Sequence, residues 1–167
     1  MYSMGKDIQS ELAVVPAAPK STATAGGSGD ATLVHGTAID TTALLTPGGS
    51  AQTPAIEGNC RYNSVMFILD VTATLADTKG IGVTASIETC AASNFSSGVV
   101  TLVATETIIS YTDSGGNTQQ LTGKIGCSLD GALQFVRVSY TPDLTASGTD
   151  VADLQACAVF GGANEYP

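Results

Sequence analysis

Apolar and polar residues alternate with a period of two along much of the chain after residue 60. In residues 64–75 (SVMFILDVTATL), one face carries Val65, Phe67, Leu69, Val71, Ala73 and Leu75. The other face carries Met66, Ile68, Asp70, Thr72 and Thr74. Because side chains alternate between the two faces of a β-strand, this pattern predicts one long strand. Residues 82–90 (GVTASIETC) alternate similarly, and the turn sequence DTKG at 77–80 predicts that the two strands form a hairpin.

More β-prone runs follow, separated by turn and loop sequences. Segments 99–105 and 107–111 predict two strands, and segments 119–125, 132–141 and 153–160 predict three more. The DSGGN sequence at 113–117 indicates a hairpin turn, and 142–150 indicates a loop. In 132–141 both faces mix apolar and polar residues, so both are expected to be partly buried. The pattern favours an all-β fold, either an antiparallel β-sandwich or a jelly roll with an extended N-terminal arm.

The N-terminal region, residues 1–60, differs from the rest of the chain. It is rich in Ala, Thr, Gly, Ser and Pro, and Pro16 and Pro19 interrupt any helix there. Short β pieces are predicted at 31–34 and 43–45. Alone, this region has too few large apolar residues to offset the entropy of ordering, so a sheet of the same subunit or a neighbour would have to order it. We therefore expect an arm, 1–60, and a β-sandwich body, 61–167, ending in a tail at 161–167.

Charge narrows the range of partners. The chain has 167 residues, is 43% hydrophobic and only 13% charged, and has a net charge of −9. The six basic residues are scattered, which argues against binding to nucleic acid or to an anionic membrane. The acidic excess suits either solubility or a basic partner surface. No apolar run reaches the length of a membrane span, and the N-terminus lacks the pattern of a signal peptide, which predicts synthesis in a cytoplasm.

Candidate chemistry is sparse. Cys60, Cys90, Cys127 and Cys157 are far apart, which favours reduced, buried thiols over a zinc site, although one or two disulfides remain open if the protein leaves the cell. The single histidine, His35, lies in the arm, where a solvated side chain is expected rather than a catalytic one. Residues 113–117 lack the later acidic ligands of a calcium loop. We therefore predict no catalytic residue, no metal and no cofactor, and hence a protein that is not an enzyme.

Three segments carry a resemblance to a known family. They are Asp7–Val15 (DIQSELAVV), Leu133–Tyr140 (LQFVRVSY) and Ala156–Pro167 (ACAVFGGANEYP). Together they resemble the small virion proteins of tailed phages, although the match is loose and covers about a third of the chain. The chain departs from that family in a long insertion at 24–54 and in lacking an acidic QESDD-type loop.

The resemblance implies a capsid decoration (cement) protein on the outside of a capsid, made in the host cytoplasm. Its implied partners are the major capsid protein and copies of itself, with a trimer expected by analogy. The arm and tail would carry the contacts, and Arg137 is either a strand residue with a solvated head or part of an inter-subunit ion pair. The candidate contact residues are Asp7, Ile8, Leu12, Val14, Val15, Arg137, Phe160 and Tyr166.

Two other classes stay open. One is a tail, head–tail joining or fimbrial subunit, and a fimbrial subunit would show donor-strand exchange and oxidised cysteines. The other is a carbohydrate-binding β-sandwich module. The chain has no Trp, so such a module would need Tyr62, Tyr111 and Tyr140 to form an exposed aromatic platform.

Overall fold

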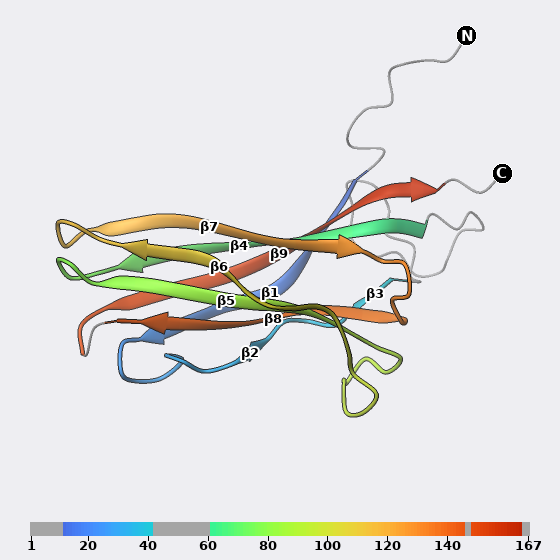
Figure 1. Ribbon diagram of the computed structural model, residues 1–167, viewed down its shortest axis with the longest axis horizontal. Coiled ribbons are helices and arrows are strands. Elements are labelled where there is room, and N and C mark those ends of the chain that lie inside the picture. The colour runs from blue at the N-terminus through green and yellow to red at the C-terminus, as the bar shows by residue number, and fades with distance from the viewer. Residues whose placement is uncertain (1–11, 42–60, 146–147, 165–167) are drawn as a thin grey trace, which may run out of the picture.

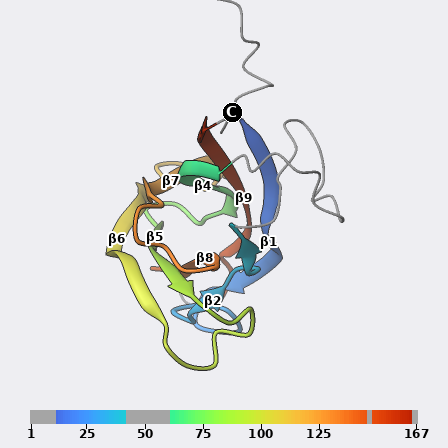
Figure 2. The same cartoon turned by 90° about the vertical axis from the view of Figure 1, so that its right-hand side faces the viewer.

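A computed structural model describes residues 12–41, 61–145 and 148–164. The described chain is built from strands, in order β1 (Ala13–Thr24), β2 (Val34–His35), β3 (Ile39–Asp40), β4 (Arg61–Thr74), β5 (Gly80–Cys90), β6 (Val100–Thr112), β7 (Thr118–Ser128), β8 (Phe135–Leu144) and β9 (Val151–Asn164). They form two antiparallel sheets that enclose one interior (Figures 1 and 2). This confirms the all-β prediction.

The order of strands identifies the topology as a jelly roll. One sheet has the order β1-β9-β4-β7 and the other β2-β8-β5-β6, with β3 also paired to β8. β2 and β3 are two pieces of one edge strand, because Val34 pairs with Tyr140 and Ile39 with Val136. Each sheet therefore has four strands, and the chain crosses repeatedly between them, as in a jelly roll.

The predicted inward faces form the core. Val65, Phe67, Leu69, Val71, Ala73 and Leu75 are all buried, as are Val83, Ala85 and Ile87 of β5. On β8 the buried face is Val136, Val138 and Tyr140. The period-two pattern was therefore interpreted correctly, since each strand has one face on the opposite sheet.

The predicted hairpins are wrong. The segments 64–75 and 82–90 do not pair with each other, because β4 pairs with β7 and β9 while β5 pairs with β6 and β8. The DTKG turn thus carries the chain from one sheet to the other. The turn at 113–117 does the same between β6 and β7. A local turn signal shows that the chain reverses, but it does not show which sheet the next strand joins.

Several strand boundaries also differ from the sequence prediction. The two strands expected at 99–105 and 107–111 are one strand, β6, whose pairing with β5 contains register shifts. β8 continues through Pro142 into the expected loop. The carbonyl of Pro142 accepts a hydrogen bond from the Ala31 N–H, on the side away from β5. The missing proline N–H points to that same side, beyond the end of β2, so the β5–β8 ladder loses nothing. β9 similarly extends to Asn164, into the expected tail.

The described part of the N-terminal region belongs to the sandwich. β1 pairs along its length with β9, and Ala13, Ala17 and Ala23 are buried in the core. The sheet of the same subunit is therefore what orders these residues. The short strand predicted at 31–34 is found as β2, slightly later, whereas the piece at 43–45 lies outside the described residues. The boundary at residue 60 stays a prediction, because residues 42–60 are not described.

Candidate interaction surfaces

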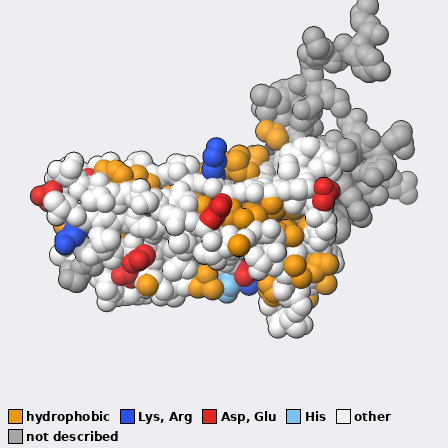
Figure 3. Space-filling model, viewed as in Figure 1, with side chains coloured by type: hydrophobic (Ala, Val, Ile, Leu, Met, Phe, Trp, Pro, Cys, Tyr) orange, Lys and Arg blue, Asp and Glu red, His pale blue; other side chains and the backbone are white. Residues whose placement is uncertain are grey.

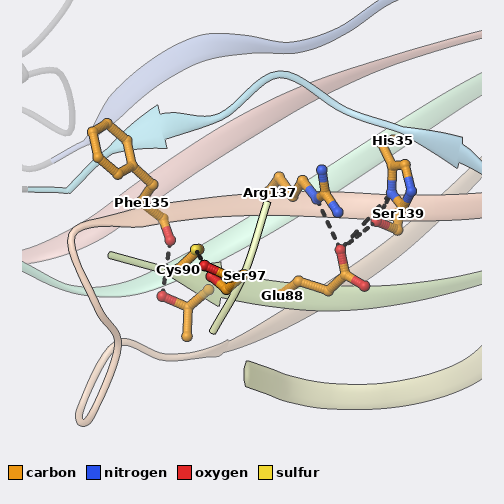
Figure 4. A network of polar contacts seen from close by, with 8 residues as sticks. His35, Glu88, Cys90, Ser97, Phe135, Arg137 and Ser139 are labelled. Atoms are coloured by element: carbon orange, nitrogen blue, oxygen red, sulfur yellow. Dashed lines mark hydrogen bonds and ion pairs between the residues drawn. The ribbon is translucent and has the colours of Figure 1, made fainter. Parts of the chain in front are cut away.

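A polar cluster on the outer side of the second sheet joins β2, β5 and β8 (Figure 4). Arg137 Nε and Ser139 Oγ both donate to Glu88 Oε2, each at 2.8 Å. His35 Nδ1 lies 2.8 Å from Ser139 Oγ and 3.9 Å from Glu88 Oε2. The Arg137 guanidinium also lies over the Phe95 ring, 4.1 Å from its centroid, in a cation–π contact. Arg137 thus has its ion pair within the chain, and its side chain is largely shielded from solvent, with 13% of its surface exposed.

The protons in this cluster can be assigned. Ser139 has one hydroxyl proton and donates it to Glu88, so His35 must donate from Nδ1 to the serine oxygen. A serine nucleophile would instead give its proton to the histidine, and it would be reachable by a substrate. Ser139 is only 1% exposed. Ser139, Glu88 and His35 therefore link β8, β5 and β2. The His35 side chain is 45% exposed, in line with the expected solvated side chain, and it also has Ser139 as a partner.

The cluster holds Glu88 in its charged form. Burial on its own would raise the pKa of Glu88, but hydrogen bonds from Arg137 and Ser139 oppose this effect, together with attraction to Arg137 and His35. The net result is a pKa below the ordinary value for a glutamate. The carboxylate is thus ionised over a wide pH range, bound to β8 by two hydrogen bonds and attracted to His35 of β2.

The predicted contact residues near the termini separate into two groups. Asp7, Ile8 and Tyr166 lie outside the described residues. Among the others, Val14 points outward with 56% of its surface exposed, and Leu12 is half-buried. Val15 and Phe160 point inward, and Phe160 packs against Tyr62 with ring centroids 5.9 Å apart. The alternation of β1 and β9 therefore leaves Val14 as the residue of this set that most clearly faces outward.

The two sides of the sandwich differ in how their edge strands are protected. β1 carries Pro16 and Pro19, and the Thr37 N–H donates to the Ala17 carbonyl at 2.6 Å, so the segment before β3 covers its edge. Proline and covering segments are common ways to prevent an edge from pairing with another chain. On the opposite side, within the part of the chain that the structure describes, β6 pairs with β5 along one edge only and is not paired with β7 (Figure 2).

The β6 edge lacks these two kinds of protection, although β7 approaches it at Gly123, where an added Cβ would lie 3.1 Å from the Ile108 carbonyl oxygen. The strand VTLVATETIISYT has no proline, and its only charged residue is Glu106. Leu102, Val103 and Ile108 are only partly buried against the core. An open groove lies between the edges of β6 and β7, lined by Ile68, Glu106, Thr107, Ile108, Thr122, Gly123 and Lys124. The face drawn in Figure 3 is mostly uncharged, with isolated charged side chains among apolar and polar ones. This side is therefore suited to contact with another protein.

The cysteines and possible metal ligands are the remaining candidates for chemistry. Cys90 is buried and free, and Cys127 and Cys157 are free and partly buried. Burial raises the pKa of the Cys127 thiol. Burial also raises the pKa of the Cys157 thiol, with a smaller contribution from the nearby Asp70 carboxylate, so both thiols stay protonated near neutral pH. Cys60 lies outside the described residues. Within the described ranges, no group of three or more His, Cys, Asp and Glu is placed to hold a metal ion.

The aromatic platform is not formed as required. Tyr62 is 7% exposed and Tyr140 is fully buried, where its hydroxyl lies 2.9 Å from Ser21 Oγ. The exposed stacking surface that the carbohydrate-binding alternative needs is therefore not available from these two residues. In the described part of the chain, no helix has the length and apolar character needed to cross a membrane.

Sequence reasoning did not identify the partners of Arg137. Glu88 lies 49 residues before it along the chain, and only the antiparallel register of β5 and β8 places the two opposite each other. Phe95 comes from the loop between β5 and β6. The sequence of β4 did contain a weaker signal for a contact surface on the other sheet. There, the apolar residues Met66 and Ile68 interrupt an outward face that is otherwise polar.

Comparison with known proteins gives structural matches only. No protein-family model matches the chain, and no curated protein matches its sequence. Among solved structures, the chain is similar to one of the infectious bursal disease virus VP2 subviral particle (10% identity, TM-score 0.47), covering 93% of this chain and 34% of that chain. It is also similar to structures of the T13 viral particle of that virus (9% identity, TM-score 0.47, covering 93% of this chain and 32% of that chain) and of its Gx strain (12%, TM-score 0.45, 93% and 33%). The chain thus spans about a third of the length of these proteins.

Proposed function

We propose that this protein is a non-enzymatic structural protein of a virion, and that it acts as a capsid decoration (cement) protein on the outer capsid lattice. The observation that carries the proposal is the asymmetry of the jelly roll. One long side is protected by prolines and a covering segment, while on the other side one edge of β6 pairs with no strand that the structure describes. An extended segment of a capsid subunit adds to such an edge through main-chain hydrogen bonds.

Three features support this role. Jelly rolls are one of the folds of viral capsid domains, although lectins and cupins share them, so the fold alone does not decide the function. The surface has few charges, and uncharged groups are easier to desolvate in a contact than ions. Finally, one weak strand contact per chain is sufficient for a decoration protein, because copies joined to each other bind a repeating lattice with avidity. Binding to the assembled shell then stabilises it by mass action.

The proposal extends to the partners and the type of virus. The major capsid protein is the proposed partner, and the resemblance to small tailed-phage virion proteins makes a phage capsid the proposed site of action. The protein is proposed to act as a homo-oligomer.

The test is to mix the purified chain with empty shells of its source virus. Co-sedimentation and an increase in the melting temperature of the shells are the expected results. Thr107→Lys should weaken binding about tenfold or more, because a lysine on an edge strand opposes strand addition. Ser28→Lys, also at an exposed position, adds the same charge far from β6 and should leave binding unchanged. Shells that neither bind nor change their melting temperature would refute the cement role, and equal binding by both variants would refute the role of the β6 edge.

A further inference from the structure

The outward face of the β1-β9-β4-β7 sheet is divided into an apolar half and a polar half. Near the chain termini, two adjacent rows of outward-facing residues cross β1, β9 and β4. The register places Val14 beside Val159 and Val159 beside Met66. In the next row, Pro16 lies beside Cys157 and Cys157 beside Ile68. We call these six residues the apolar patch.

The apolar patch is exposed to solvent in the single chain. Val14 is 56% exposed and Met66 is 36% exposed, while Ile68, Cys157 and Val159 are half-buried by their neighbours. A shallow groove runs along β1 and β9 through Val14, Pro16 and Cys157. Beyond the patch, the same face becomes polar, with Asp70, Gln155, Thr122, Thr72, Gln120 and Asp153. Protein–protein interfaces usually have an apolar core and a polar rim, so the apolar half of this face suits the core of a contact and the polar half suits its rim.

We infer that this face binds the same face of a second copy of the chain, sheet against sheet. Three observations favour a second copy as the occupant. The first is size: the whole face, its polar half included, has four strands about 4.8 Å apart at about 3.3 Å per residue, which gives about 19 by 40 Å, or roughly 750 Å². A stable interface of standard size buries about 800 Å² of each partner.

The second observation is charge. A chain with a net charge of −9 repels its own copies, so a contact between copies has to avoid opposing carboxylates. The six residues of the apolar patch include no acidic residue, and in the polar half of the face Asp153 is paired with Lys20. At its border, Lys124 lies beside Ile68, and Asp70 lies in the next row. In a two-fold pair each copy contributes both groups, so opposite charges can meet twice.

The third observation concerns the alternative occupant from the same chain. Residues 1–11 come directly before Leu12 in the sequence, and they carry three charged residues, Lys6, Asp7 and Glu11, together with Met1, Tyr2, Met4 and Ile8. Such a segment is a poorer match for an apolar surface than a second apolar patch, because its charged groups would lose hydration. The inferred contact is two-fold, in place of the trimer that the family resemblance implies, and it does not depend on shell binding.

The experiment is sedimentation velocity on the full chain without shells, from low to high micromolar concentration. The expected result is a reversible dimer with twice the chain mass of 16.8 kDa. Val14→Glu and Met66→Glu should each raise the dissociation constant about 100-fold or more, because a charge would be buried without a partner. Leu33→Glu is the matched control, since Leu33 is 54% exposed but precedes β2 on the other sheet, and it should leave the dimer intact.

A second readout uses the thiol in the patch. Alkylation of Cys157, followed by peptide mass spectrometry, should slow as the concentration of the chain rises, and Val14→Glu should abolish this protection. A monomer at every concentration, a trimer, or a dimer that resists both patch variants would overturn the inference. Protection of Cys157 that is independent of concentration would also overturn it, because the chain's own residues would then cover the patch. Shell binding is measured separately, so either proposal can fail alone.

Discussion

Replacing Arg137 by methionine tests whether the polar cluster stabilises the sandwich. The methionine keeps an apolar stem of similar length but removes the guanidinium that donates to Glu88 at 2.8 Å and lies over Phe95. A hydrogen bond to a charged group contributes about 1.5–3 kcal/mol and a partly desolvated cation–π contact about 0.5–2 kcal/mol. Since these contributions are not fully additive, we expect a loss of about 2–4 kcal/mol in the free energy of unfolding at pH 7.

Burial is the reason for this magnitude, so an exposed ion pair provides the control. Lys20 Nζ lies 2.8 Å from Asp153 Oδ2, the same distance as in the Arg137–Glu88 pair. However, the side chains of Lys20 and Asp153 are 63% and 36% exposed, against 13% and 19% for Arg137 and Glu88. Water screens the exposed pair, so Lys20→Met should cost less than about 0.5 kcal/mol. Urea titration is the suitable assay because urea does not screen charges.

The pH dependence gives a second, independent check. The pKa of Glu88 is lowered in the folded chain, so the unfolded chain binds the proton more tightly. The contribution of the ion pair is therefore fully present above the ordinary carboxyl pKa and is lost as the pH falls through the lower, folded-state pKa. The difference between the wild type and Arg137→Met should thus be largest at pH 7 and shrink towards pH 3. A difference below about 0.5 kcal/mol at pH 7, or one that does not change with pH, would refute this reasoning.

Two further predictions concern the connecting segments of the sandwich, between β2 and β3 and between β6 and β7. Gly36→Ala places a Cβ 2.6 Å from the Ala17 carbonyl oxygen and 2.9 Å from the Val138 carbonyl oxygen. The substitution should therefore lower the free energy of unfolding, measured by urea titration, by about 1–3 kcal/mol. An unchanged urea midpoint would contradict this close contact. Asp113 accepts backbone hydrogen bonds from Gly115, Asn117 and Gly116, which lower its pKa. Asp113→Asn should therefore lower the melting temperature more at pH 7 than at pH 3, because the wild-type carboxyl is itself becoming protonated at pH 3. An equal loss of melting temperature at both pH values would argue against a role of the carboxylate charge.

The sequence by itself determined which residues are buried within β4 and β5. The alternation in these two strands predicted their core faces because a strand inside a sandwich exposes its side chains alternately to the core and to solvent. It also indicated the turns at 77–80 and 113–117, since their residues favour chain reversal. The sparse charge pointed to a protein whose surface suits contact with other proteins.

Only the tertiary structure decided which strands pair. β4 and β5 are consecutive in sequence but lie in different sheets, whereas β1 and β9 are neighbours although they come from opposite ends of the chain. Alternation is the same whichever strand lies alongside, so it carries no information on pairing. The cluster around Arg137, the unpaired β6 edge and the apolar patch all depend on these long-range pairings. For this reason their residues become a surface or a network only after the whole sandwich has formed.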